Sequence, residues 1–328
     1  MQRLISAFKG QRVAVWGDFI LDEYIYTRAS RVSREAPVLI SEFESQEFRL
    51  GGAGNVAANI RTLGGEPFPI GFIGNDDGGE ILRRVLDRQG ICDKGLVAVT
   101  NFTTPRKTRI LSGDHHTRRQ QVLRIDRLNR MPLTDEQRSS LLDRLAEVID
   151  QCGFLVISDY LNCSVRPDDF NVLRARSSLP PVAVDSRRHL RSFTSVRVAT
   201  PNLTELQRLF PESDFQNESE YLRAAMSLHE QINSDGLLLK RGDEGMLLLE
   251  RNRSPQRIGI YGSREIVDVT GAGDTVIAVI ALGQASGGDL LSCARIATVA
   301  AGLSVMKAGA ATITPAELEQ ALTSGNFS

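Results

Sequence analysis

Short apolar runs alternate with longer amphipathic segments along most of the chain. Arg12–Asp18 has the pattern of a buried strand that ends in an acidic turn, and a helix is predicted over about 51–63. Pro69–Ile73 predicts a second buried strand, followed by a helix over about 78–88. Strands that alternate with helices in this way favour an α/β fold with a doubly wound, mostly parallel sheet.

The same alternation returns in the second half of the chain. Strands are predicted at Phe154–Ser158, Val182–Val184, Arg197–Thr200 and Gly236–Lys240, with antiparallel additions at Gly245–Leu249 and Ile258–Tyr261. Helices are predicted over about 134–150, 273–284 and 290–306.

Between the two halves the pattern changes to that of a β-hairpin. Thr104–Leu111 and Gln120–Asp126 alternate around the polar turn Ser112–Arg119, and Val38–Phe43 is short and extended. No linker, repeat or low-complexity stretch divides the chain. We therefore predict one domain over residues 1–328, with a small β lid formed by about residues 31–50 and 104–126.

Composition and charge narrow the class of protein. The chain has 328 residues, 41% of them hydrophobic, and a formal net charge of −1, so nothing global points to nucleic acid or a membrane as partner. The four cysteines form no CxxC pair, which favours free thiols in a reduced compartment. The sequence has no signal-peptide pattern and no apolar run long enough to span a bilayer. We expect a soluble cytoplasmic protein.

Three predicted strands end in aspartates, namely Asp18, Asp159 and Asp185. In open parallel sheets, ligands bind beyond the carboxyl ends of the strands, so these carboxylates mark a candidate site. Acidic residues that cap the following helices would explain each of them equally well.

The segment Asp268–Asp274, with the sequence DVTGAGD, is the most informative candidate for a catalytic site. Gly271 and Gly273 lack side chains, so the backbone N–H groups of residues 271–273, including Ala272, can turn toward one point at the start of an apolar helix. Such a helix start favours an anion, for example a phosphoryl group in transfer. Asp274 lies beside this anion site and could accept a proton from a hydroxyl. The alternative is a glycine-rich turn with an Asp cap.

A second glycine-rich segment begins at Gly51 and Gly52 and continues to Asn55. It lacks the G-x-G-x-x-G spacing of nicotinamide cofactor sites. Glycines that let a polyol approach the backbone, with Asn55 binding its hydroxyls, suit the segment better. A tightly packed helix start is the structural alternative.

These segments together resemble the PfkB (ribokinase-like) family of carbohydrate kinases. The DVTGAGDT string is similar to the family's second signature, and the GGAGN segment is similar to the first. Asn202 and Glu205 match its NxxE motif, and Leu239–Gly245 matches its nucleotide-binding turn. The motifs stand in the family's order over about residues 12–320.

The resemblance implies an ATP-dependent phosphotransferase with Mg²⁺ and, through Asp268 and Thr270, a monovalent cation such as K⁺. It implies Asp274 as the base and the amides of Gly271, Ala272 and Gly273 as the anion hole. It assigns the substrate sugar to Asp18, Gly51, Gly52 and Asn55, the nucleotide to Asn202, Glu205, Lys240, Gly242 and Gly245, and water-mediated Mg²⁺ binding to Glu205. Family members often pair as homodimers through the β lid.

Within the family, the segments Arg31–Val38, Arg49–Asn55, Lys107–Leu111 and Ser158–Tyr160 resemble D-glycero-β-D-manno-heptose 7-phosphate kinase, the kinase half of ADP-heptose synthase. This branch implies a sugar phosphate whose distal phosphate Lys107 and Arg109 bind. The residues Leu161–Cys163 and Ser186–Arg188 depart from the branch pattern. No HxGH-type nucleotidyltransferase motif follows, so we expect the kinase half alone.

Several alternatives stay open. The acceptor could be ribose, fructose or ketodeoxygluconate instead of a heptose phosphate. The basic residues of the lid could form a solvated or dimer-facing surface. Outside the kinases, a nicotinamide oxidoreductase on a similar sheet or a catalytically silent binding protein remain possible classes, which ATP turnover with a panel of sugars would separate.

Overall fold

The computed structural model describes residues 1–113, 119–129, 131–262, 267–307 and 309–324. Its main sheet has nine strands in the order β13-β12-β11-β10-β9-β8-β1-β4-β5. The strands are β1 (Arg12–Gly17), β4 (Glu66–Gly74), β5 (Leu96–Val99), β8 (Phe154–Asp159), β9 (Val182–Ser186), β10 (Val198–Ala199), β11 (Gly236–Lys240), β12 (Met246–Glu250) and β13 (Gln256–Ile258).

The strands from β11 to β5 in this order pair in parallel, and β12 and β13 are added antiparallel. The parallel sheet and its antiparallel edge are therefore as the sequence predicted. The strand sequences are continuous apolar runs because both faces of the sheet are buried. In β1, Val13 and Val15 pack on one face of the sheet, and Ala14 and Trp16 pack on the other.

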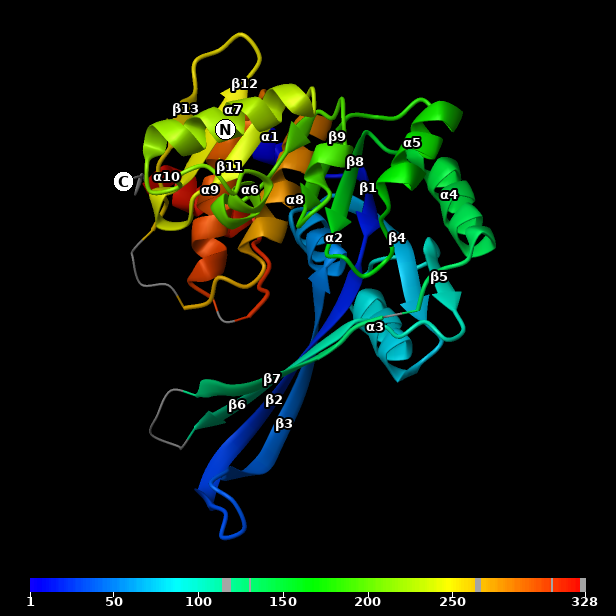
Figure 1. Cartoon of the computed structure of the whole chain (residues 1–328), viewed down its shortest axis with the longest axis vertical. Coiled ribbons are helices and arrows are strands. Elements are labelled where there is room, and N and C mark those ends of the chain that lie inside the picture. Colours follow the sequence, from blue (N-terminus) through cyan, green and yellow to red (C-terminus); the bar gives the residue numbers. More distant parts are fainter. Residues whose placement is uncertain (114–118, 130, 263–266, 308, 325–328) are drawn as a thin grey trace.

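Helices cover both faces of the sheet (Figure 1). One core contains residues of α1 (Gln2–Ser6), α2 (Ala53–Thr62), α3 (Asp77–Arg88), α8 (Ala272–Ala285), α9 (Leu290–Val305) and α10 (Pro315–Ser324). The other contains residues of α4 (Asp135–Ile149), α5 (Pro167–Arg176), α6 (Leu203–Leu209) and α7 (Glu218–Gln231). Among the described helices, none combines the length and apolarity that crossing a bilayer requires.

A second sheet of four strands projects from this core as a long, narrow extension (Figure 1). Its order is β3-β2-β6-β7, with β2 (Phe19–Val32), β3 (Leu39–Gly52), β6 (Arg106–Gly113) and β7 (Gln120–Arg127). The hairpin of β6 and β7 was predicted, although residues 114–118 of its turn lie outside the described residues.

The prediction omitted β2 and limited β3 to Val38–Phe43. The first six residues of β2 are all buried, so this half shows no alternation of polar and apolar positions. Its buried acidic residues, Asp22 and Glu23, also make it look like a polar loop. The extension therefore begins at Phe19 rather than at about residue 31.

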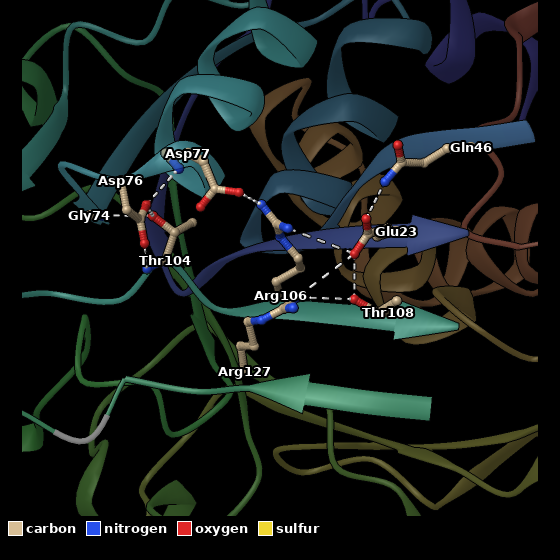
Figure 2. Close-up of polar contacts among 10 residues, drawn as sticks. Glu23, Gln46, Gly74, Asp76, Asp77, Thr104, Arg106, Thr108 and Arg127 are labelled. Atoms are coloured by element: carbon tan, nitrogen blue, oxygen red, sulfur yellow. Dashed lines mark hydrogen bonds and ion pairs between the residues drawn. The ribbon is translucent and has the colours of Figure 1, made fainter. Parts of the chain in front are cut away.

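A buried carboxylate ties the extension to the core (Figure 2). Glu23 of β2 accepts hydrogen bonds from Gln46 of β3 and Thr108 of β6. Arg106 lies 3.9 Å from Glu23 and donates to Asp77, at 2.6 Å, in the first turn of α3. Because these contacts join three strands to a helix of the core, they hold the base of the extension in one orientation.

Candidate active site

The predicted site residues gather where the parallel strands end. The neighbouring strands β1, β8, β9, β10 and β11 all reach this edge, so the loops that follow them converge there. The start of α8 and the base of the extension close the site from two further sides, since Asp274 of α8 and Lys107 of β6 both contact Tyr160.

Asp274 lies in the first turn of α8 and is 4% exposed. Its Oδ2 accepts a hydrogen bond from Asn55 Nδ2 of α2 at 2.9 Å, and its Oδ1 accepts one from the Tyr160 hydroxyl at 2.7 Å. Burial raises the pKa of Asp274 to about 6, although these two hydrogen bonds act in the opposite direction. A carboxylate with this pKa is ionised at neutral pH and basic enough to accept a proton.

The glycine loop before Asp274 has the left-handed backbone at one position. Gly271 has φ 84° and directly precedes α8, whereas Gly273 lies inside the helix and is not among the residues with positive φ. A Cβ added to Gly271 would lie 2.5 Å from Asn55 Nδ2. Gly271 is therefore the position at which only glycine combines the backbone conformation with the close approach of Asn55.

Tyr160 and Arg187 are site residues that sequence reasoning did not assign. Tyr160 follows β8, and the Arg187 guanidinium stacks on its ring at 4.4 Å from the centroid. Lys107 of β6 lies 5.2 Å from the same ring centroid, and burial lowers the pKa of its ammonium group. Among the residues that the structure describes, neither Lys107 nor Arg187 forms an ion pair with a carboxylate. The available signals were their positions after the strand-end residues Asp159 and Asp185, and the comparison with the heptose-kinase branch, which singled out Ser158–Tyr160 and Ser186–Arg188 without giving either residue a role.

The aspartates at the strand ends differ in what they contact. Asp18 is 1% exposed, and its carboxylate accepts hydrogen bonds from the backbone N–H groups of Tyr160, Asn162 and Ser164 at 2.8, 3.0 and 2.9 Å. Burial raises the pKa of Asp18 to about 6. The carboxylate thus fixes the loop after β8, and its predicted contact with the sugar stays a prediction.

Asp159 likewise serves local structure, because it accepts hydrogen bonds from the Leu161 amide at 2.9 Å and the Ser186 hydroxyl at 2.7 Å. Packing requires glycine at both Gly51 and Gly52, since a Cβ would lie 2.5 Å from Asp22 Oδ2 at the first and 2.6 Å from the Asp18 carbonyl oxygen at the second. Their predicted contact with the sugar stays a prediction.

Arg109, predicted to hold a substrate phosphate, is 8% exposed and bound to Asp22, with Nη1 donating to Oδ1 at 2.7 Å. Its guanidinium also lies 5.2 Å from the Tyr24 ring centroid. One of its five N–H donors is used by Asp22, and the ion pair makes Arg109 a poorer candidate for anion binding than Lys107.

On the nucleotide side, Asn202 and Glu205 form a capping box at the start of α6, with mutual hydrogen bonds of 2.8 and 2.9 Å. Lys240 Nζ forms an ion pair with Asp185 Oδ2 at 2.8 Å. Burial raises the pKa of Glu205, and the charge of Asp185 raises it further. Two neighbouring carboxylates and a lysine suit a divalent cation with bound phosphates.

A cavity of about 470 Å³ opens beside the glycine loop. It is lined in part by the predicted nucleotide residues Lys240, Gly242 and Gly245, by Gly273 of the loop, and by Ala301 of α9. Its other walls are largely apolar, from Met246, Val276, Val305 and their neighbours. A cavity with apolar walls and a polar mouth at the anion loop suits a purine base with its phosphates.

Asp268 links two segments near the glycine loop through hydrogen bonds. Its Oδ1 accepts a hydrogen bond from the Thr270 amide at 2.9 Å, and its Oδ2 accepts one from the Gly309 amide at 3.0 Å. Over the described residues, no group of three or more His, Cys, Asp and Glu side chains could hold a metal ion. The monovalent cation site at Asp268 and Thr270 stays a prediction.

Comparison with known sequences gives one family. The profile of the pfkB family carbohydrate kinase matches residues 11–317. The bifunctional protein HldE of Pelobacter propionicus is 33% identical over 325 residues, which cover 98% of this chain and 65% of the relative. HldE of Trichlorobacter lovleyi is 36% identical over 312 residues, 94% of this chain and 62% of the relative. The chain thus spans less than two thirds of the length of these relatives.

Comparison with solved structures gives the fold. Arabidopsis thaliana ribokinase, complexed with ribose and ATP, superposes with a TM-score of 0.71 at 20% identity, over 96% of this chain and 99% of the other. Escherichia coli phosphofructokinase-2 superposes with TM-scores of 0.76 in complex with substrates and products and 0.75 in complex with potassium, at 18% identity and the same coverage. The fold is ribokinase-like, as predicted.

Proposed function

Because the chain belongs to the PfkB family of carbohydrate kinases, we propose that it transfers the γ-phosphate of ATP to a sugar hydroxyl, with Asp274 as the base. The observation that carries this proposal is the placement of Asp274. It is a buried carboxylate with a raised pKa, in the helix turn that follows the glycine loop and beside the 470 Å³ cavity. The family match supports the kinase prediction over a nicotinamide oxidoreductase.

In the proposed mechanism, different elements at the site bind the sugar, accept its proton and stabilise the phosphoryl group. The sugar binds between Asn55, Tyr160 and the base of the extension, which brings its hydroxyl to Asp274. As the hydroxyl attacks, Asp274 accepts its proton. The amides of Gly271, Ala272 and Gly273 donate to the oxygens of the phosphoryl group, where negative charge develops.

The phosphates of ATP face Lys240, and Asp185 and Glu205 are the carboxylates that would hold Mg²⁺, Glu205 through water. When bound, Mg²⁺ neutralises the charge of the phosphates. The raised pKa of Glu205 beside Asp185 fits this role, because two carboxylates in proximity favour a cation between them. Asp268 and Thr270 are the proposed site of K⁺.

For the acceptor we propose a sugar phosphate, with D-glycero-β-D-manno-heptose 7-phosphate and its anomeric hydroxyl as the specific candidate. The lid segments that resemble heptose 7-phosphate kinases support the heptose. The cations of Lys107 and Arg187 beside the Tyr160 ring support the phosphate, since neither pairs with a carboxylate among the described residues. A neutral sugar would leave the partly buried ammonium group of Lys107 without an anionic partner.

This proposal predicts how Arg187→Met changes substrate preference. Wild-type enzyme should prefer heptose 7-phosphate to free ribose, fructose and ketodeoxygluconate in a coupled ADP assay. Arg187→Met should lower kcat/KM for the sugar phosphate by about 10–100-fold, the value of one charge-assisted contact, and leave any activity on free sugars unchanged. Arg188→Met is the matched control, because Arg188 is the adjacent arginine and is exposed like Arg187, but only Arg187 stacks on Tyr160 among the described ring contacts. A preference for a free sugar that Arg187→Met does not alter would assign the enzyme to another branch of the family.

We further propose a cytoplasmic homodimer that pairs through the extension. Large apolar side chains are exposed on or beside its strands, at Val32, Val38, Leu39, Phe43, Val122, Leu123, Ile125 and Leu128. Exposed apolar side chains gathered on one sheet are typical of a surface that another subunit covers. The four free cysteines are compatible with a reducing compartment.

The dimer can be tested with Phe43→Glu, since Phe43 of β3 is 66% exposed. Sedimentation velocity should show a dimer for the wild type and a monomer for the variant, because a buried charge at the interface has no partner. Met226→Glu on α7, at a side chain 44% exposed in the core domain, should remain dimeric. A monomeric wild type, or a dimer unaffected by Phe43→Glu, would exclude pairing through this surface.

A further inference from the structure

In the part of the chain that the structure describes, the Tyr160 hydroxyl contacts the candidate base, Asp274. It donates to Asp274 Oδ1 at 2.7 Å, while Asn55 donates to Oδ2 at 2.9 Å. The two donors come from different elements, the loop after β8 and helix α2, and the carboxylate comes from a third, α8. A carboxylate bound at both oxygens cannot rotate freely about its side-chain bonds, so its lone pairs keep fixed directions.

Tyr160 is itself held from several sides. Its amide donates to Asp18 Oδ2 at 2.8 Å, and its ring carries the stacked guanidinium of Arg187. The next residue, Leu161, has φ 66°, a left-handed conformation that a leucine adopts only under the constraint of its surroundings. Asp18 supplies that constraint, because it binds the amides of three residues of this loop. These contacts therefore hold the side chain of Tyr160 in one position.

Packing alone does not account for a tyrosine at this position. A phenylalanine would offer the same ring to Arg187 and Lys107. Only the hydroxyl distinguishes the two residues, and in the described part of the chain its hydrogen-bond partner is Asp274.

We propose that Tyr160 is a positioning residue for the phosphoryl-transfer reaction, which holds the Asp274 carboxylate ionised and oriented toward the sugar hydroxyl. The inference rests on the proposed role of Asp274 as the base. The hydroxyl acts through Asp274 and takes no proton in the reaction. Because the phenol donates a hydrogen bond to the charged carboxylate, it stabilises the ionised form relative to the protonated form.

The electrostatic surroundings set the direction of the effect. Burial raises the pKa of Asp274 to about 6, and the hydrogen bonds from Asn55 and Tyr160 lower it. Among the charged groups that face Asp274, Asp185 raises its pKa, Lys107 lowers it, and Lys240 adds a further positive charge. A base must be ionised to act, so wild-type kcat/KM should rise with pH through about 6. Loss of the Tyr160 hydroxyl removes one lowering contribution and should move this rise to higher pH.

The test is the pH profile of kcat/KM for Tyr160→Phe. The acid limb should move upward by roughly one pH unit, the size of one hydrogen bond to a charged group, while KM for ATP stays within twofold. Tyr26→Phe is the matched control, since Tyr26 also donates to a carboxylate, Glu47 at 3.2 Å, but on the extension away from the base. Its profile should follow that of the wild type.

A second variant keeps the inference testable if Tyr160→Phe is unstable. Tyr160→3-fluorotyrosine keeps the shape of the ring and makes the phenol a stronger donor, so the acid limb should move to lower pH. Profiles that coincide with the wild type for the folded variants would overturn the role of Tyr160. Asp274→Asn, assayed in parallel, separates the two claims: if it retains turnover, the proposed base is wrong, whereas if it is inactive and the profiles coincide, only the Tyr160 inference fails.

Discussion

Asp274→Asn is expected to lower the turnover number by about 10³-fold while the affinity for ATP stays within a few-fold. The amide is nearly the same shape as the carboxylate but cannot accept the proton of the attacking hydroxyl. That proton moves only in the transition state, so the loss should appear in kcat and not in nucleotide binding. The measurement is steady-state kinetics together with ATP titration by calorimetry.

Asp168→Asn provides the matched control for Asp274→Asn. Asp168 also lies in the first turn of a helix, α5, but its side chain is 83% exposed. Its replacement should leave kcat unchanged. If Asp274→Asn kept more than about a tenth of wild-type turnover, the general-base role would be excluded, because positioned bases contribute 10²-fold or more.

Gly271→Ala is expected to lower turnover by about 100-fold, with a smaller effect on folding. The new Cβ would lie 2.5 Å from Asn55 Nδ2, and Asn55 holds the Oδ2 atom of Asp274. Asn55 must therefore move, and the base and the amides of the loop lose their alignment. The left-handed φ of 84° adds strain of about 1 kcal/mol, which should lower the melting temperature by a few degrees.

Gly287→Ala separates backbone strain from displacement of Asn55. Gly287 has φ 78°, close to that of Gly271, but a Cβ there meets no atom within 4 Å. Gly287→Ala should lose only the stability that the left-handed backbone costs, and only Gly271→Ala should lose activity. Equal loss of activity in both would mean that the damage is a general effect of destabilisation.

The sequence correctly predicted those elements of the fold that have a clear local pattern of apolar residues between turn residues. The strand Arg12–Gly17 and helix α8 carry continuous apolar runs between turn residues, so their type and approximate bounds were correct. Strand β2 was missed because its buried half lacks alternation and includes Asp22 and Glu23, whose partners come from other strands. Tertiary partners of buried charges leave no local trace in a sequence.

In the candidate site, too, local motifs could be predicted from the sequence and contacts between distant residues could not. The glycine loop and Asp274 were found because their chemistry is contiguous in the sequence. The contact of Tyr160 with Asp274 joins residues 114 positions apart, and the stack of Arg187 on Tyr160 depends on the order of β8 and β9 in the sheet. The ion pair of Arg109 with Asp22 could not be foreseen, because Asp22 lies in the strand that was missed, and the role of Arg109 in phosphate binding stays a prediction.

We propose that this chain transfers the γ-phosphoryl group of ATP to a sugar hydroxyl, with Asp274 as the base. The decisive measurement is ³¹P NMR of the wild-type protein with ATP, Mg²⁺ and heptose 7-phosphate, and of Asp274→Asn under the same conditions. With the wild type we expect equal amounts of ADP and a new anomeric phosphoester, and with the variant we expect neither. Release of inorganic phosphate without a phosphoester, for this acceptor and for a panel of free sugars, would contradict it.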